Sequence, residues 1–287
     1  MFKGKNKGDK SRLFFAISPG RSGSSYLSHL LNTSKDVVSF HEADPKMTAG
    51  FLSMVSDDPF HRSFEARKVK ANFIKAFAEQ LPRGKIYCET NHMFIKTFFD
   101  VVISEFLENV EVIILRRDIA KVLKSFVELG YFSQLNENWP QWMSSPNSAT
   151  SAIACIAEDS ELDQYDLCIA YIIDIEARAQ RFRKEYPWIK SYEVDIEELN
   201  DYESIERLFS QLKITPSKKT KASYKNKVNH KSSRKQQLDR PVDINYCCQR
   251  IDEYIDRARK MNICVPKTLC YKSLTQMNHE GYCSELR

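Results

Sequence analysis

The stretch LFFAISPGRSGSSYLSHLL, residues 13–31, decides the predicted fold. Its first five residues form an apolar run of strand length, and Pro19-Gly20 ends that run where the chain must turn. After Gly23 the apolar residues recur at helical spacing, so a helix begins there. The free N–H groups of residues 22–25 then lie at a helix N-terminus, where unsatisfied donors and the helix dipole favour a bound phosphate or sulfate. The sequence therefore predicts an anion-binding loop, to which Arg21 and the serine hydroxyls add donors.

Strand-like and helix-like segments alternate along the rest of the chain. After the first strand, further strands are predicted at residues 37–40, 85–88, 110–115 and 188–194. Helices are predicted at residues 60–81, 94–107, 119–127 (capped by Asp118), 167–186 and 243–261, with a further amphipathic helix ending near residue 212. This alternation predicts an α/β fold of three layers, αβα, with a central and mostly parallel sheet.

Length and composition predict one globular domain over residues 1–287. The chain has 42% hydrophobic residues, a formal net charge of +5 and no internal repeat. Residues 1–11 are polar and basic, which predicts a flexible N-terminus rather than a signal peptide, and no window approaches the roughly 18 apolar residues of a membrane span. We therefore expect a soluble, cytoplasmic protein that does not associate with membranes.

Eight cysteines occur without any Cys-x-x-Cys pair. Reduced structural thiols are the favoured interpretation, and no metal site is predicted. The three cysteines near the C-terminus, Cys264, Cys270 and Cys283, would form a disulfide set only in an exported protein.

Two segments have no clear period. Residues 130–165 are rich in Asn, Ser and Pro and carry three aromatic landmarks, Tyr131, Trp139 and Trp142, as expected of a lid loop on the acceptor side of a site. Residues 217–236 are basic and almost free of apolar side chains, so they are predicted to form a loop outside the core.

A second motif changes the interpretation of the first. Along residues 115–125 a basic side chain, Arg117, leaves a strand end, and Ser125 follows eight positions later on the next helix. This pattern resembles the 3′-phosphate-binding signature of sulfotransferases that use 3′-phosphoadenosine 5′-phosphosulfate (PAPS), although Ile119 stands where that family usually has Pro. Likewise SPGRSGSSYL resembles the family's 5′-phosphosulfate loop of the Pro-Arg-Ser-Gly-Thr-Thr type, and residues 191–199 are similar to its Tyr-Glu-Asp-Leu segment.

The resemblance implies a P-loop-like sulfotransferase fold and a PAPS-dependent enzyme that needs no metal. Its product from the donor would be 3′-phosphoadenosine 5′-phosphate (PAP), and the sulfonate group would pass to a hydroxyl or amine of a small molecule. The implied cofactor-binding residues are Arg21, Ser22, Gly23, Ser24, Ser25, Tyr26, Arg117 and Ser125, with Lys225, Lys227, Arg234 and Lys235 as candidates from the basic segment. Arg21 would also act in catalysis, at the bond that breaks. We expect a monomer or homodimer that binds no nucleic acid.

Three residues compete for the role of general base. Glu42 lies in a segment, Phe40 to Asp44, that is similar to the glutamate-containing segment of tyrosylprotein sulfotransferases, and it follows a predicted strand end, where ligands bind in parallel sheets. Cytosolic members of the family are known for a histidine base, and His92 lies near the corresponding place. Glu89 stands where the family usually has Lys, so it also competes.

Two other classes of function stay open. A P-loop kinase-like phosphotransferase would need the lysine of a GxxxxGK[ST] motif, and no Lys follows Gly23. A basic nucleic-acid-binding module would use the lysines between residues 218 and 235, but Tyr224 is the one aromatic residue among them. For the enzyme, the acidic side chains Glu158, Asp159, Glu161, Asp163 and Asp166 motivate a cationic acceptor, for example an alkaloid toxin from secondary metabolism.

Overall fold

The described part of the chain contains one sheet of five strands, and every pairing in it is parallel. The computed structural model describes residues 12–224 and 242–270. The strands are β1 (Leu13–Ile17), β2 (Val37–Phe40), β3 (Ile86–Glu89), β4 (Val110–Arg116) and β5 (Lys190–Asp195). Their order across the sheet is β2-β3-β1-β4-β5. The predicted α/β fold with a parallel sheet is confirmed.

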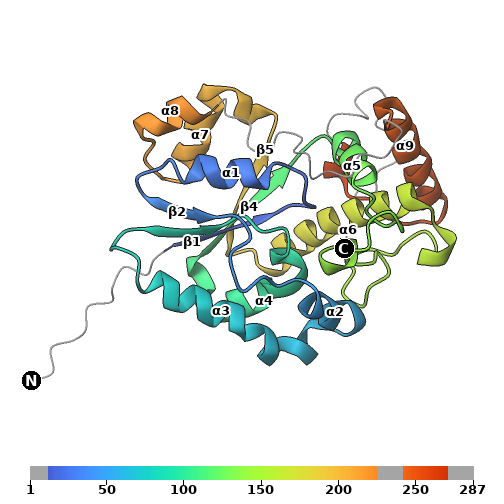
Figure 1. Cartoon of the computed structure of the whole chain (residues 1–287), viewed down its shortest axis with the longest axis horizontal. Coiled ribbons are helices and arrows are strands. Elements are labelled where there is room, and N and C mark those ends of the chain that lie inside the picture. The colour runs from blue at the N-terminus through green and yellow to red at the C-terminus, as the bar shows by residue number, and fades with distance from the viewer. Residues whose placement is uncertain (1–11, 225–241, 271–287) are drawn as a thin grey trace, which may run out of the picture.

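Helices cover both faces of this sheet (Figure 1). The helices of the described residues are α1 (Ser24–Leu31), α2 (Gly50–Asp57), α3 (Phe64–Ala78), α4 (Phe99–Phe106), α5 (Ile119–Glu128), α6 (Gln164–Glu185), α7 (Tyr202–Gln211), α8 (Lys218–Ser223) and α9 (Ile244–Lys260). Helices α1, α7 and α8 lie on one side of the sheet, and α3 and α4 on the other (Figure 1). The three-layer αβα arrangement expected from the sequence is therefore present.

The core is divided into two parts by the sheet. Leu13, Phe15 and Ile17 of β1 belong to the cluster that includes α3, α4 and α6, whereas Phe14 belongs to the cluster beneath α1 and α7. Successive side chains of a strand point to opposite faces, so a strand buried on both faces must be apolar at every position. This explains why β1 has a continuous apolar sequence, LFFAI, and why all five of its residues are buried.

The register of the sheet brings the strand ends together. Phe40 at the end of β2 is aligned with Glu89 at the end of β3, so His41 and Glu42 emerge beside the residues that follow β3. Ile17 is aligned with Ile114, and β4 continues past that point to Arg116. In a parallel sheet all these carboxyl ends lie along one edge, where the crevice at a change of strand order binds ligands.

Several boundaries differ from the sequence prediction. Helix α2 was not predicted. The predicted helix at 94–107 begins with a π-helical turn, Phe94–Phe98, before α4. Part of the predicted basic loop is helical, because the Ser217 side chain caps α8 and the Ser217 backbone N–H donates to the Thr220 hydroxyl oxygen. The predicted flexible N-terminus, residues 1–11, lies outside the described residues.

The cysteines are not all reduced. Cys88, Cys155, Cys168, Cys247 and Cys248 are free thiols, as expected, but Cys264 is disulfide-bonded. No helix within residues 12–224 and 242–270 is both long enough and apolar enough to span a membrane.

Candidate functional site

The loop between β1 and α1 is shaped to present backbone N–H groups. Three of its residues have positive φ angles: Gly20 (85°), Arg21 (53°) and Gly23 (88°). The first N–H that donates into α1 is that of Leu27, to the Gly23 carbonyl oxygen at 2.9 Å, so the N–H groups of residues 24–26 have no acceptor within the helix. Left-handed turns followed by a helix N-terminus form a concave set of donors that attracts anions. The loop therefore has the form that the sequence predicted.

Close packing fixes the start of α1. A Cβ atom on Gly23 would lie 2.6 Å from Cγ1 of Ile196, so only glycine fits there. The Tyr26 hydroxyl donates to the carbonyl oxygen of Leu199 at 3.1 Å and contacts that of Tyr224. Burial raises the pKa of Tyr26 to about 12. Of the predicted cofactor-binding residues, Tyr26 can therefore offer its N–H, while its side chain holds the loop against the chain that follows β5.

The serines of the loop differ in what they can offer. The Ser22 side chain is buried, and its hydroxyl donates to the Gly20 carbonyl oxygen at 3.1 Å, which stabilises the turn. Ser24 is mostly buried and Ser25 is partly exposed. The contribution of Ser22 to an anion is thus its N–H rather than its hydroxyl, whereas Ser25 can offer both.

Two distant parts of the chain meet at Arg21. Its Nε donates to Oγ of Ser125 on α5 at 3.2 Å, and Nη1 of Arg117 donates to the Arg21 carbonyl oxygen at 2.8 Å. The structure thus brings together the two motifs that the sequence singled out, although about 100 positions separate them. One cationic cluster results, made of Arg21 and Arg117. The Ser125 hydroxyl hydrogen has no acceptor within residues 12–224 and 242–270, so it can serve a ligand.

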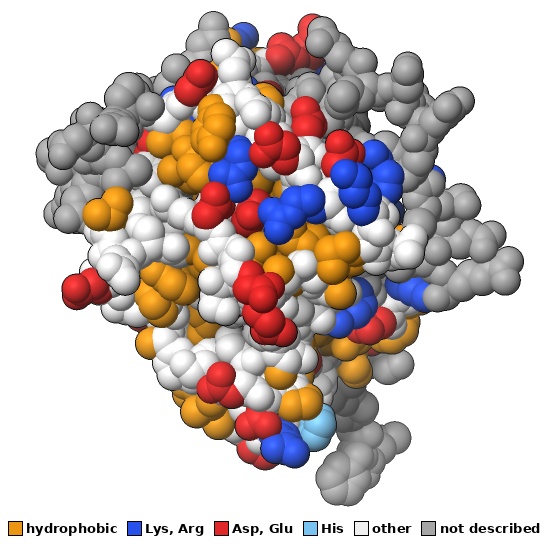
Figure 2. All heavy atoms as spheres, turned by 90° about the vertical axis from the view of Figure 1, so that its right-hand side faces the viewer, with side chains coloured by type: hydrophobic (Ala, Val, Ile, Leu, Met, Phe, Trp, Pro, Cys, Tyr) orange, Lys and Arg blue, Asp and Glu red, His pale blue; other side chains and the backbone are white. Residues whose placement is uncertain are grey.

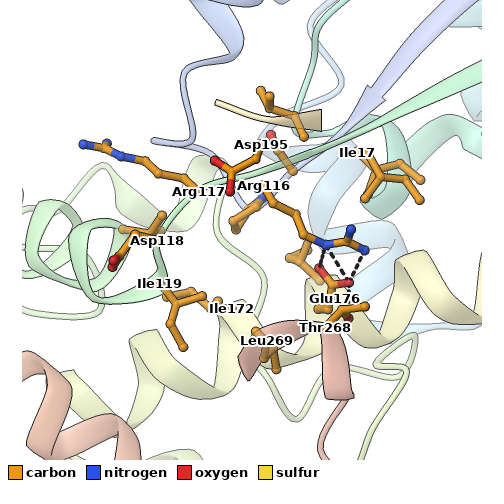
Figure 3. Close-up of a pocket in the computed structure, with 16 residues that line it drawn as sticks. Ile17, Arg116, Arg117, Asp118, Ile119, Ile172, Glu176, Asp195, Thr268 and Leu269 are labelled. Carbon is orange, nitrogen blue, oxygen red and sulfur yellow. Dashed lines mark hydrogen bonds and ion pairs between the residues drawn. The ribbon is translucent and has the colours of Figure 1, made fainter. Parts of the chain in front are cut away.

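Neighbouring arginines at the end of β4 have different roles. Arg116 pairs with Glu176 of α6 at 2.6 Å and with Glu193 of β5 at 2.9 Å, so its charge is neutralised. Arg117 is one-third exposed and lies 3.9 Å from Glu197. Figure 3 shows Arg116 turned toward Glu176 at the pocket beside β4, with Arg117 pointing away from it. Arg117, the residue selected by its spacing to Ser125, is the one left for a ligand.

A second cluster lies at the ends of β2 and β3. Glu42 has a left-handed backbone, with φ of 54°, and its side chain is 38% exposed. Its Oε1 is 3.6 Å from Nε2 of His41 and 3.6 Å from Nε2 of His92. The two predicted candidates for the base, Glu42 and His92, therefore belong to one cluster. This cluster lies next to the loop between β1 and α1, because a Cβ atom built on Gly20 would lie 3.5 Å from Nδ1 of His92.

His92 is held from behind by Lys96, which lies on the π-helical turn. The Lys96 Nζ is 3.1 Å from Nδ1 of His92 and 2.8 Å from the Tyr171 hydroxyl, and it also donates to the Trp142 carbonyl oxygen. Burial, with the nearby Lys96 charge, lowers the pKa of His92 well below its usual value. Burial also lowers the pKa of Lys96, with a contribution from Arg178. An imidazole in this position stays neutral near pH 7.

The third candidate for the base, Glu89, is fully occupied by structural contacts. Both its oxygens are buried: Oε1 accepts from Lys70 and Asn91 at 2.8 Å each, and Oε2 accepts from the Tyr87 hydroxyl at 2.7 Å. A carboxylate with this set of donors inside the core cannot reach an acceptor molecule. The geometry leaves Glu42 and His92 as candidates for the base.

The basic segment begins with helix α8. Helix α8 starts near the C-terminal end of α1, where the Ser217 hydroxyl donates to the Thr33 carbonyl oxygen. Tyr224, the residue after α8, accepts a hydrogen bond from the Tyr26 hydroxyl through its carbonyl oxygen. The predicted cofactor-binding residues of this segment, Lys225, Lys227, Arg234 and Lys235, lie outside the described residues.

Residues 130–163 pack closely against α2 and α6. The Ala49 N–H donates to the Gln141 carbonyl oxygen at 2.7 Å, and the Thr150 hydroxyl donates to that of Val55 at 2.7 Å. Burial raises the pKa of Tyr131, on which the charges of Arg21 and Glu42 act in opposite directions. This segment therefore borders the site, and its predicted function as a lid over an acceptor stays a prediction.

The acidic side chains near α6 are largely paired. Asp166 contacts Arg250 and Arg257 of α9 at 3.0 and 2.8 Å, and Asp163 contacts Arg250 at 2.8 Å. Asp159 accepts hydrogen bonds from Asn147 and Ser145. Figure 2, which faces α9, shows acidic and basic side chains interspersed on this surface rather than an acidic patch. Asp163 and Asp166 therefore stabilise the packing of α9, and the cationic acceptor stays a prediction.

Two residues of the site had no role in the sequence prediction. His41 directly precedes Glu42, but nothing in the sequence indicates that both side chains reach the same place. Lys96 follows His92 by four positions, which is the spacing of contacting residues on a helix, so a helical reading of residues 92–96 would have paired them. The signal was missed because a lysine in an apolar helix is ordinarily expected at the surface.

Comparisons with known proteins show structural similarity to sulfotransferases. No protein-family model matches the chain, and no curated protein sequence matches it. A sulfotransferase from Mycobacterium avium has a TM-score of 0.47 and 13% identity, over 87% of this chain and 77% of that one. The sulfotransferase domain from the curacin biosynthetic pathway has a TM-score of 0.49 and 12% identity, over 91% and 100%. The sulfotransferase domain of the Synechococcus PCC 7002 olefin synthase has a TM-score of 0.47 and 13% identity, over 92% and 100%. At these identities and scores, function must be inferred from the side chains themselves.

Proposed function

We propose that the protein transfers the sulfonate group of PAPS to a hydroxyl or amine of a small molecule. The observation that carries this proposal is the contact of Arg21 with Ser125, together with that of Arg117 with the Arg21 carbonyl oxygen. A ligand with two anionic groups, one at the loop and one at α5, would engage both motifs at once. PAPS has such a pair in its 5′-phosphosulfate and its 3′-phosphate.

The residues present fit such a donor. The N–H groups of Ser24, Ser25 and Tyr26 would hold the 5′-phosphosulfate, because they lack acceptors within α1 and lie at its positive end. Arg117 and the Ser125 hydroxyl would hold the 3′-phosphate. The bound donor would supply the sulfonate group and a leaving phosphate, and the protein would supply positioning and charge stabilisation.

Arg21 and Glu42 would carry the remaining chemistry. Arg21 uses Nε for Ser125, and its Nη1 and Nη2 have no hydrogen-bond partner within the described residues, so they can stabilise charge that grows on the leaving oxygen. The Glu42 carboxylate would take the proton of the acceptor hydroxyl or amine at an Oε atom, since its side chain is exposed while Glu89 is enclosed. His92, neutral and buried, would hold Glu42 in place.

Binding of PAP to Arg117→Ala tests the donor assignment. A charge-assisted hydrogen bond contributes about 1.5–3 kcal/mol, so the dissociation constant measured by calorimetry should rise about 10- to 150-fold. Arg62→Ala is a matched control, because the Arg62 side chain is 66% exposed and its carboxylate partner, Asp58, lies on its own segment. Unchanged PAP affinity in Arg117→Ala would disprove the assignment, and tight magnesium-dependent ATP binding would favour a kinase instead.

The acceptor requires a screen. Purified protein incubated with labelled PAPS and a panel of phenols, alcohols, amines and cationic alkaloids should transfer label to one of these classes. The paired state of Asp163 and Asp166 gives cationic compounds no advantage in this panel. The cytoplasmic location and the monomeric or homodimeric state expected from the sequence stay predictions.

A further inference from the structure

Glu42 lies between two histidines that come from neighbouring strands. His41 follows β2 and His92 lies just beyond β3, and each places Nε2 at 3.6 Å from the same oxygen, Oε1 of Glu42. A distance of 3.6 Å is longer than a hydrogen bond, but contacts of this kind tighten when a substrate binds. The function of each histidine depends on which ring nitrogen holds the proton. In each ring the hydrogen-bond partner of Nδ1 determines that tautomer.

His92 must have its proton on Nε2. Its Nδ1 lies 3.1 Å from the Lys96 Nζ, and as an ammonium group Lys96 can only donate, so Nδ1 accepts. If Lys96 is neutral, its two hydrogens serve the Trp142 carbonyl oxygen and His92, while its lone pair accepts from the buried Tyr171 hydroxyl. The opposite assignment would leave the Tyr171 hydrogen without an acceptor among the described residues, which is costly at a buried site. In either charge state His92 therefore presents an N–H to Glu42.

His41 must have the opposite tautomer. Its Nδ1 is 2.9 Å from the Thr90 carbonyl oxygen, which can only accept, so Nδ1 carries a proton. The Thr90 hydroxyl, 3.3 Å from the same nitrogen, donates its own hydrogen to the Ser24 carbonyl oxygen and can likewise only accept from His41. Neutral His41 thus presents a lone pair on Nε2 to Glu42.

We propose that His41 removes the proton that Glu42 takes from the acceptor, while His92 only positions Glu42. This inference rests on the proposed function. The acceptor O–H or N–H bond breaks as its electron pair attacks the sulfur, and the sulfur–oxygen bond to the 5′-phosphate breaks with its pair leaving on that oxygen. The proton goes to an Oε atom of Glu42, then to Nε2 of His41, which becomes an imidazolium and releases the proton to water. The His41 side chain is 33% exposed and that of His92 is 11% exposed, so of the two histidines His41 is the one placed to pass a proton to water.

The charged and titratable groups around Glu42 define the pH behaviour. They are His41 after β2, His92 and Lys96 after β3, and Tyr131 from the segment that follows α5. Burial lowers the pKa of His92 and raises that of Tyr131, so both stay neutral near pH 7. His41 accepts a proton only when it is neutral. Protonation of Nε2 in advance should therefore block the transfer from Glu42 and lower turnover on the acid side of the pH profile.

The tautomers can be measured without any activity. Nitrogen-15 NMR of the full-length protein with labelled histidine distinguishes a protonated from a lone-pair nitrogen in each ring. We expect the Nε2–H form for His92 from pH 6 to 8, and the Nδ1–H form for neutral His41. An Nε2–H form at neutral His41, or an imidazolium at His92 in this range, would overturn the proposal. The variants His41→Asn and His92→Asn assign the two signals.

Kinetic measurements then distinguish proton removal by His41 from the positioning of Glu42 by His92. His41→Asn keeps a donor for the Thr90 carbonyl but loses Nε2, so kcat should fall by less than the roughly 10²- to 10⁴-fold expected for loss of Glu42 itself, with the KM for PAPS unchanged. In His41→Asn the acid limb, the part of the pH profile where kcat falls on acidification, should move to lower pH. Added imidazole should restore turnover to a second variant, His41→Ala.

His92→Asn, which keeps an acceptor for Lys96, should retain the acid limb of the parent, and the exposed His61→Asn is the control. If the acid limb of the kcat profile is the same in His41→Asn as in the parent protein, the proposal is contradicted. Absence of PAPS turnover in the parent defeats the proposed function instead, and with it the relay to His41, whatever the tautomers prove to be.

Discussion

The clearest test of the division between structural and reactive carboxylates is Glu89→Gln. Glu89 and Lys70 form a pair in which both side chains have no exposed surface, with 2.8 Å between Oε1 and Nζ. Burial lowers the pKa of Lys70, and the charge of Glu89 acts against that effect. The substitution keeps the shape of the side chain and removes its charge, so it leaves the buried Lys70 ammonium group without its paired carboxylate.

The expected cost follows from that burial. Breaking a buried ion pair by removing one partner costs about 3–5 kcal/mol, and the amide keeps one acceptor for Lys70, so we expect about 3 kcal/mol. At about 2 °C per kcal/mol, the lower limit for chains of 150–250 residues, the melting temperature should fall by about 6 °C. Without Glu89 the pKa of Lys70 falls further below its unfolded value. The unfolded state then binds more protons than the folded state, so the stability of the variant should rise with pH.

Thermal unfolding followed by circular dichroism between pH 6 and 9 measures this effect. Glu42→Gln is the matched control, because the Glu42 side chain is 38% exposed and should change stability by no more than about 0.5 kcal/mol. The double variant Lys70→Met with Glu89→Gln removes both charges and should recover part of the loss. The reasoning is refuted if Glu89→Gln melts like the parent while its turnover collapses, since Glu89 would then be the base.

Three further predictions concern the site and the sheet. Glu42→Gln should lower kcat about 10²- to 10⁴-fold with PAP affinity unchanged in calorimetry; normal turnover would exclude Glu42 as the base. Gly23→Ala should weaken PAP binding and lower the melting temperature, because the new methyl group would lie 2.6 Å from Ile196 at a φ of 88°, and a stable variant with normal affinity would contradict the proposed loop geometry. For Glu111, burial acts to raise the pKa, but hydrogen bonds, chiefly from Arg12, outweigh it and lower that pKa. Ionised Glu111 therefore stabilises the folded state above its unfolded pKa, and this stability is lost as the pH falls through its folded pKa. In Arg12→Ala the free energy of unfolding should depend less steeply on pH in that window.

The fold and the turn between β1 and α1 could be predicted from the sequence because both depend on local patterns. A strand, a glycine turn and a helix can be recognised within twenty residues, and the spacing from Arg117 to Ser125 selected the arginine that the structure leaves available. Pairings between distant residues could not be predicted in this way. The partner that makes Glu89 structural is Lys70, 19 positions earlier on α3, and no spacing rule connects them.

The position of the last paired strand residue explains which charged side chains are structural. Arg116 and Glu89 each occupy the final pair of a strand, opposite Asp195 and Phe40, and each is enclosed by partners of opposite charge. Arg117 and Glu42 lie one and two positions beyond the last pair of their strands, where the ladder no longer fixes the side chain. A charge inside the ladder points into a covered face of the sheet and must be neutralised there, whereas a charge just beyond it faces the crevice. A shift of one residue in where β4 ends would therefore exchange an arginine that is neutralised within the sheet for one that faces the crevice.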